Sequence, residues 1–227
     1  MRVLVVDTSA EVALLGRLLG VRTVLAAMRG DRGDRTHRAA YDAATILLAP
    51  WSERTADDDW PAAWRTKTVF TGAISRFDDH TATDPDDRGG RAGRRVLALW
   101  GARGREVGHD DIAAAEAATP EWEWVVRSPH RPSPDLWREL SEAEVVVTHA
   151  GQNMVAEVAA ARRPAVVVAQ PRPFDEQLGT VRALRRVSAC VALDRWPDPD
   201  EWPGLLDRAR SLGGHRWEVW HDGDGAQ

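Results

Sequence analysis

Along the first fifty residues, short apolar runs typical of strands alternate with segments whose apolar residues have helical spacing. Residues 2–7 form a short β-branched run that ends in an acid, which predicts a buried parallel strand. Residues 10–19 repeat apolar positions at helical spacing and are followed by Gly20, which is typical of the end of a helix. The alternation continues with a strand, a helix and a strand, predicted over 23–27, 36–44 and 46–49. This order predicts a parallel α/β sheet.

Between residues 52 and 93 the apolar residues no longer follow a regular spacing. Aspartates, prolines and paired glycines crowd this stretch with little periodicity, and we interpret it as a surface linker. An apolar interruption at 69–73 predicts a short strand that enters the hinge. We therefore expect three parts: residues 1–51, a linker at 52–93 and a second unit at 94–227.

The second unit opens with a strand over 95–100 and a glycine loop containing Gly101, Arg103 and Gly104. A helix follows with Asp110 as its candidate cap, and the succession of strand, glycine loop and helix forms a cradle for phosphate groups. Another helix is predicted to begin at Ser133, because a proline follows at the first turn. Further strands are predicted over 121–127, 145–148, 165–169 and 191–193, and further helices over 153–161, 174–185 and 201–212.

Composition excludes several classes of protein. No stretch approaches eighteen uncharged apolar residues and the N-terminus lacks a basic stretch before an apolar core, so we expect a soluble, cytoplasmic protein. The net charge of −5 over 227 residues argues against a protein that coats nucleic acid or anionic lipid. The single cysteine, Cys190, has no partner for an internal disulfide or a cysteine-based zinc site.

Candidate chemistry gathers directly after a predicted strand of the second unit. His149, Gly151, Gln152 and Asn153 stand at the mouth of the next helix, where open α/β sheets place their ligands. Backbone N–H groups attract an anion there, the imidazole and the amide can donate to phosphate oxygens, and the glycine lets a ligand approach the main chain. Glu157 lies one turn deeper on the same face, where a carboxylate can accept from the vicinal hydroxyls of a ribose. Taken singly, the histidine or the glutamate is more often a solvated surface residue.

Nine residues in this region keep the spacing of a known signature: His149, Gly151, Asn153, Glu157, Pro164, Pro171, Asp175, Glu176 and Gln177. They resemble the nucleotide-sugar signature of the two-Rossmann-domain (GT-B) glycosyltransferases. The resemblance is greatest to the C-terminal domain of bacterial peptidoglycan-type N-acetylglucosaminyltransferases and of macrolide-type glycosyltransferases, and it covers about residues 94–212. One element departs from the family, because Arg162 stands at the glycine of its Gly-x-Pro strand entry.

The resemblance implies an α/β fold of Rossmann-like parallel sheets in the GT-B architecture, with an incomplete first domain. It implies that the diphosphate is bound by one group of residues, the ribose by Glu157, and the donor sugar by Glu176 with Gln177. The diphosphate group consists of His149, Gly151 and Asn153, with Gly101, Arg103 and Gly104 facing it from the first loop.

The implied reaction transfers a hexose or N-acetylhexosamine from a nucleoside diphosphate sugar, expected to be UDP-linked, to an acceptor hydroxyl. Hydrogen bonds and the helix dipole stabilise the leaving group, so the reaction requires neither a metal nor another cofactor. The acceptor is a lipid-linked molecule, a glycan or a small molecule, and no nucleic acid is expected as a partner.

Residues 1–51 resemble only the second half of the acceptor-side domain. Asp7 matches the acid that orients a catalytic histidine in some family members, so it is the candidate catalytic residue of this unit. The matching histidine is missing from the sequence. An aspartate that ends a strand and caps the next helix through Thr8 and Ser9 explains the position equally well.

Other functions stay open at this point. The chain can be a non-catalytic nucleotide-sugar-binding module, or one half of a two-subunit glycosyltransferase in which a protein partner or self-association completes the N-terminal half. A sugar-nucleotide epimerase shares the double Rossmann plan but needs more carboxylates and histidines in its cleft. Metal binding is a weaker alternative, because the two Asp-x-Asp stretches, at 84–86 and 198–200, lie in proline-rich acidic segments instead of at strand ends.

Overall fold

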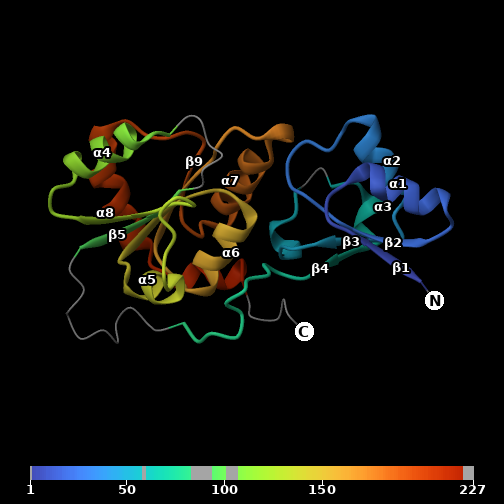
Figure 1. The fold of residues 1–227 in the computed structure, drawn as a ribbon, viewed down its shortest axis with the longest axis horizontal. Coiled ribbons are helices and arrows are strands. Elements are labelled where there is room, and N and C mark those ends of the chain that lie inside the picture. The colour runs from blue at the N-terminus through green and yellow to red at the C-terminus, as the bar shows by residue number, and fades with distance from the viewer. Residues whose placement is uncertain (1, 58–59, 83–93, 101–106, 222–227) are drawn as a thin grey trace.

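The chain folds into two units, each built on a parallel β-sheet (Figure 1). This computed structural model describes residues 2–57, 60–82, 94–100 and 107–221. The first sheet has the strand order β1-β2-β3-β4 and the second has the order β6-β5-β7-β8-β9. Two parallel α/β sheets are the fold class that the alternation of strands and helices predicts, and that prediction is confirmed. Among the helices in the described ranges, none is long and apolar enough to cross a membrane.

The first unit follows the predicted alternation and then extends beyond it. Its elements are β1 (Val3–Val6), α1 (Ala10–Leu18), β2 (Arg22–Ala26), α2 (Arg35–Ala43), β3 (Ile46–Ala49), a 3-10 turn (Glu53–Thr55), α3 (Ala62–Arg65) and β4 (Thr68–Phe70). β4 pairs in parallel with β3, so the short strand expected at the hinge is the fourth strand of the first sheet. Trp60 and Trp64 also pack into the core of this unit, which therefore reaches past residue 51 to Phe70.

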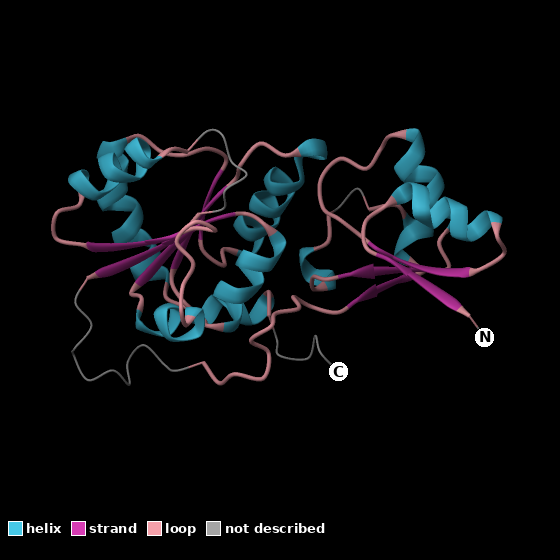
Figure 2. Cartoon of the chain, viewed as in Figure 1, coloured by secondary structure: helices cyan, strands magenta, loops and turns pink. Residues whose placement is uncertain are grey.

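One face of the first sheet is covered by helices and the other is not. Figures 1 and 2 show α1 and α2 on the same side of the sheet. The strand residues that face them, such as Val6, Leu25 and Leu47, are at most 3% exposed. On the opposite face Val5 is 70% exposed and Ile46 is 37% exposed. A parallel sheet normally has both faces covered, so this apolar face is unusual.

The second unit contains the remaining elements in regular alternation. They are β5 (Arg95–Leu99), α4 (His109–Ala118), β6 (Glu123–Arg127), α5 (Leu136–Glu142), β7 (Val145–His149), α6 (Gln152–Ala160), β8 (Ala165–Val168), α7 (Glu176–Val187), β9 (Val191–Leu193) and α8 (Trp202–Leu212), with 3-10 turns at Pro173–Asp175, Pro199–Glu201 and His215–Val219. Alternate strand residues point to opposite faces and form two cores. One core packs against α5, α6 and α7, and the other against α4 and α8 (Figure 1).

Two predicted helix starts are wrong. The helix expected at Ser133 begins at Leu136 instead, because Asp135 is the N-cap and its carboxylate accepts from the amide of Arg138 at 3.1 Å. The helix expected to have Asp110 as its cap begins after Gly108, and Asp111 reaches back to accept from the Gly108 amide at 2.7 Å. Ser133 and Asp135 compete for the cap of α5, whereas the N-cap of α4 is a glycine with no side chain to mark it, so pattern alone identifies neither start.

The two units meet through close backbone contact. The amide of Asp31, after β2, donates to the carbonyl of Phe174 at 2.6 Å. Gly30 has φ +93° and lies so close that a Cβ there would overlap that same carbonyl, and a Cβ on Gly179 would come within 2.8 Å of the Gly30 amide. Only glycine fits at this crossing, which places the start of α7 against the loop that follows β2.

Candidate functional site

The strand order of the second sheet creates a crevice at its carboxyl edge. The chain passes from β5 outward to β6 and then returns to β7 on the other side of β5. Ligands of open α/β sheets bind at such a switch point. Trp100 follows β5 and His149 ends β7, and their rings meet edge to face with centroids 6.1 Å apart. The glycine loop with Gly101, Arg103 and Gly104, predicted to border this crevice, lies outside the described residues.

His149 is locked against the start of α6. Its Nδ1 accepts from the amide of Gly151 at 3.0 Å, which leaves the proton of a neutral imidazole on Nε2 as a donor. Gly151 is the N-cap of α6 and has no side chain to satisfy the first amides of that helix. A Cβ on Gly151 would come within 2.6 Å of His149 Cε1, so the close packing of ring and backbone needs glycine.

The charge state of His149 suits a hydrogen-bond donor. Burial, with a smaller contribution from the positive charge of Arg172, lowers the pKa of His149 to about 4. The imidazole is therefore neutral at physiological pH and donates from Nε2 without requiring protonation. Asn153, the second residue of α6, is exposed at the same helix end, and Gln152 is partly exposed beside it. Together they form a set of donors for an anion at the N-terminus of α6.

The depressed pKa of His149 predicts a pH dependence of stability. In the unfolded chain the His149 ring is protonated near pH 6.5, whereas in the folded chain it stays neutral down to pH about 4. Between these pH values the unfolded state binds the extra proton, so the free energy of unfolding falls as pH falls. The contribution is fully present above the unfolded pKa. In urea unfolding, the native chain is expected to lose more stability between pH 7 and pH 4.5 than His149→Asn, which has no titrating ring. Equal losses in the two proteins would contradict this assignment.

Glu157 lies one turn deeper on α6 and is only 8% exposed. Burial raises the pKa of its carboxyl, and the charge and hydrogen bond of Arg76 oppose this rise. Arg76 Nε lies 3.0 Å from Glu157 Oε1. The other oxygen, Oε2, is buried and has no hydrogen-bond partner within the described part of the chain. The carboxylate therefore keeps one free acceptor, which is the property expected of a residue that binds a hydroxyl group.

The two residues assigned to the donor sugar lie at the start of α7 but have different surroundings. Gln177 is 3% exposed, and its Oε1 accepts from the backbone amide of Gln170 at 2.8 Å. This bond joins the loop after β8 to α7 and leaves only the amide nitrogen of Gln177 for a ligand. Glu176 is half-buried, and burial raises its pKa against the opposing charges of Arg32 and Arg172.

Glu176 also borders a small cavity between the units, together with Arg29, Gln152 and Thr180. The two residues before it, Phe174 and Asp175, both have left-handed backbone angles, with φ of 62° and 52°. Such angles are costly for residues with a side chain and persist only where surrounding contacts hold them. The start of α7 is therefore held in a defined position at the crevice.

Asp7 is not brought to this group of residues. It is exposed after β1, the outermost strand of the first sheet, and its carbonyl accepts from the Ser9 amide at 2.9 Å. The N-cap of the following helix is Ser9, whose hydroxyl accepts from Val12 at 3.3 Å. No contact within the described residues joins Asp7 to the second unit.

The structure adds residues that pattern analysis of the sequence did not single out. Arg76 contacts Glu157. Besides burial, the positive charge of Arg172 lowers the pKa of His149 and opposes the rise in the pKa of Glu176, and the charge of Arg32 opposes that rise as well. Arg172 sits next to the predicted sugar-binding segment, so proximity in sequence was an available signal. Arg76 and Arg32 belong to other parts of the chain, and no local signal points to them. Among the described residues, no group of three metal-ligating side chains converges.

Comparison with known proteins gives one family match and several matches among solved structures. Residues 133–195 match the model of the glycosyltransferase family 28 C-terminal domain. Among solved structures, the spinosyn rhamnosyltransferase SpnG is similar with a TM-score of 0.68 and 18% identity, over 99% of this chain and 69% of that chain. MurG of Acinetobacter baumannii has a TM-score of 0.60 and 18% identity, over 92% of this chain and 65% of that chain. Comparison with curated proteins gives no match.

These matches bear on different parts of the chain. The family model covers the segment from the start of α5 to just after β9, which contains His149, Glu157 and Gln177. The structural likeness extends over nearly the whole chain and, at these identities, shows the fold. The chain therefore has the GT-B fold, and residues 133–195 of its second unit resemble the C-terminal domain of family 28 glycosyltransferases.

Proposed function

We propose that this chain binds a UDP-linked hexose or N-acetylhexosamine and transfers the sugar to an acceptor hydroxyl without a metal ion. The observation that carries the proposal is the arrangement at the start of α6. A neutral imidazole and the first amides of the helix lie at the N-terminus, and one turn deeper lies a buried carboxylate with one oxygen that has no partner among the described residues. Donors followed by an acceptor at this spacing match a diphosphate followed by a ribose.

Each residue then has a role in the proposed reaction. His149 Nε2 and the amides of Gln152 and Asn153 hold the diphosphate beside Gly151, Glu157 accepts from the ribose, and Glu176 accepts from the donor sugar. The acceptor oxygen forms a bond to the anomeric carbon as the bond from that carbon to the diphosphate breaks. The negative charge that develops on the leaving group is stabilised by the positive end of the α6 dipole. The acceptor proton passes to a base, and Asp7 remains our candidate for orienting that base.

The relatives support this assignment indirectly. SpnG has also been solved with thymidine diphosphate and with spinosyn aglycone, so that protein binds both a nucleotide and an acceptor. Its fold is shared by this chain, although the identity is 18%. We infer by this likeness that the carboxyl edge of the second sheet is the nucleotide side of the crevice.

Calorimetric titration with UDP, UDP-N-acetylglucosamine and dTDP-glucose tests the proposed function. Glu157→Ala is expected to weaken binding about tenfold or more, since it removes charge-assisted hydrogen bonds to the ribose. Glu116→Ala is the matched control, because Glu116 is an exposed glutamate on α4 of the same unit. Absence of binding by all three nucleotides, or equal affinity of Glu157→Ala and the native chain, would refute the donor site.

The uncovered face of the first sheet favours a second candidate, one half of a two-subunit glycosyltransferase. Val5 and Val24 are in register, as are Val24 and Ile46, so their side chains form one continuous apolar row. β1 is also an edge strand with unpaired backbone groups on its outer side. Apolar strand faces of this kind are stabilised by a second layer of structure.

Light scattering distinguishes this candidate from a chain that acts alone. If a second copy covers the face, the native chain is expected to form dimers, and Val5→Lys is expected to shift it toward the monomer, because a charge would be buried in the contact. Arg22→Lys, which keeps the charge on the same sheet, serves as control. A native chain that binds UDP and stays monomeric at all concentrations contradicts self-association through this face.

A further inference from the structure

The segment after β4 crosses to the second unit and is anchored there. The amide of Ala73 donates to the carbonyl of Trp220 at 3.2 Å. Asp78 Oδ1 and His221 Nε2 lie 2.6 Å apart, and both side chains are at most 8% exposed. The ring of Phe77 packs against Trp137 of α5 with centroids 5.2 Å apart. These contacts on both sides of Arg76 hold its backbone in a fixed place over α6.

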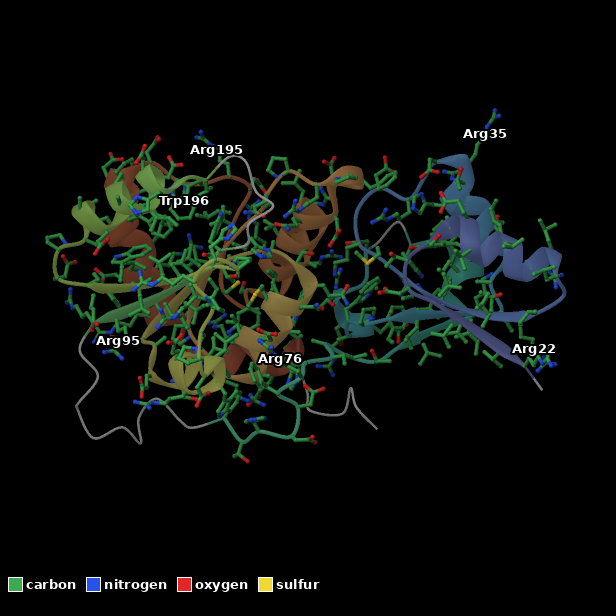
Figure 3. All side chains as sticks on the ribbon, in the orientation of Figure 1. Arg22, Arg35, Arg76, Arg95, Arg195 and Trp196 are labelled. Atoms are coloured by element: carbon green, nitrogen blue, oxygen red, sulfur yellow. The ribbon has the colours of Figure 1, made fainter. Side chains whose placement is uncertain are left out.

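Arg76 and Glu157 form an ion pair in which the two side chains differ in exposure to solvent. The arginine side chain is 62% exposed, whereas that of the glutamate is 10% exposed. Its guanidinium also lies over the Phe77 ring, 4.9 Å from the centroid, which limits the rotamers it can adopt. Figure 3 shows Arg76 beside α6, at the side of the second unit where the connecting segment passes. The cation therefore approaches from the solvent side and engages only Oε1 of the carboxylate.

We infer that Arg76 is a positioning residue of the nucleotide site, which holds Oε1 of Glu157 and so presents Oε2 to the ribose hydroxyls. This inference rests on the proposed function. Two observations carry it: Arg76 Nε lies 3.0 Å from Oε1, and the buried Oε2 of the same carboxylate has no partner in the part of the chain that the structure describes. A buried acceptor without a hydrogen-bond donor destabilises the protein, and a ligand hydroxyl can supply that donor.

The charge of Arg76 has a second effect on the same group. Burial favours the neutral form of Glu157, and Arg76 is the charged group that opposes this. His149, at the end of the strand that precedes the same helix, is neutral at physiological pH. Without Arg76 the carboxyl would therefore hold its proton to higher pH and would lose part of its capacity to accept.

The experiment compares two ligands that differ only in the ribose, UDP and 2′,3′-dideoxy-UDP, by calorimetry. The native chain is expected to favour UDP about tenfold, because two hydroxyl contacts are lost in the analogue. Arg76→Ala is expected to reduce this preference to about twofold, and Arg76→Lys to retain most of it, since a cation remains near Glu157. Arg35→Ala is the control, because Arg35 projects into solvent at the far end of the first unit (Figure 3).

The ratio of the two affinities separates positioning from a general structural effect. A variant that only loosens the fold weakens both ligands alike and leaves the ratio unchanged. If Glu157→Ala abolishes the preference and Arg76→Ala keeps it, the role of Arg76 is overturned while the proposed function stands. If neither variant changes the preference, or if UDP does not bind the native chain, the assignment of Glu157 itself is wrong and the inference falls with it.

Discussion

Replacing Gly151 with alanine is expected to weaken UDP binding about tenfold or more, because one hydrogen bond from the imidazole to a charged ligand, about 1.5–3 kcal/mol, is lost. The backbone of Gly151 has φ −72° and ψ 140°, which alanine adopts without strain, so the fold itself should persist. The new Cβ would come within 2.6 Å of Cε1 and 2.7 Å of Nδ1 of His149. The imidazole must then turn away, so its Nε2 donor leaves the anion site and its Nδ1 loses the hydrogen bond from the Gly151 amide.

A matched control exists within the same unit. Gly204 lies in α8, and a Cβ built on it meets no atom within 4 Å. Gly204→Ala is therefore expected to leave UDP affinity unchanged and to raise the free energy of unfolding by about 0.5–1 kcal/mol, because alanine is the better helix former. Calorimetry gives the affinities and urea unfolding gives the stabilities. UDP affinity of Gly151→Ala within threefold of the native value, about 0.6 kcal/mol, would show that the imidazole does not contact the ligand.

The largest loss of stability is expected for Trp217→Ala, about 3–5 kcal/mol in the free energy of unfolding. Trp217 lies in the last 3-10 turn, is fully buried, and belongs to the core that packs against α5, α6 and α7. Its indole Nε1 donates to the carbonyl of Arg163 at 2.7 Å. Truncation removes a large apolar surface, leaves a cavity and strips a buried carbonyl of its donor.

Trp217→Phe separates packing from hydrogen bonding. It keeps most of the apolar volume and loses the Nε1 donor, so its expected cost is smaller, about 1–2 kcal/mol. Both variants are measured by urea unfolding followed by circular dichroism. A loss below 1 kcal/mol for Trp217→Ala would mean that the C-terminal turn is not part of the core. Such a result would also argue against the inference that contacts with Trp220 and His221 hold Ala73 and Asp78 in place.

Much of the fold could be predicted because it depends on short-range patterns. The alternation of β-branched runs with helically spaced apolar residues predicted the strands and helices of both sheets, within one or two residues at most ends. β4 was predicted only as a hinge strand. It has three residues within an acidic, proline-rich stretch, and its place is fixed by pairing with β3 and by packing of Trp60 and Trp64. Such long-range contacts leave little local pattern.

In the candidate site, too, local spacing predicts some of the residues and long-range contacts determine the others. His149, Gly151, Asn153 and Glu157 lie on one strand end and the helix that follows, so their spacing alone places them together. Arg76 reaches Glu157 from a distant segment, and only the crossing of residues 73–80 to the second unit brings them into contact. The bond from Gln170 to Gln177 likewise depends on how a loop folds back on a helix, which spacing does not reveal.

Backbone amide shifts measured by nuclear magnetic resonance during titration with UDP test the central claim most directly. If the start of α6 binds the diphosphate, the amides of Gly151, Gln152 and Asn153 shift and saturate together. The amides at the start of α8, a helix end that is not at the switch point, remain unchanged and serve as the internal reference. Shifts that centre elsewhere, or no saturable shift at Gly151–Asn153, would contradict a nucleotide site at the carboxyl end of β7.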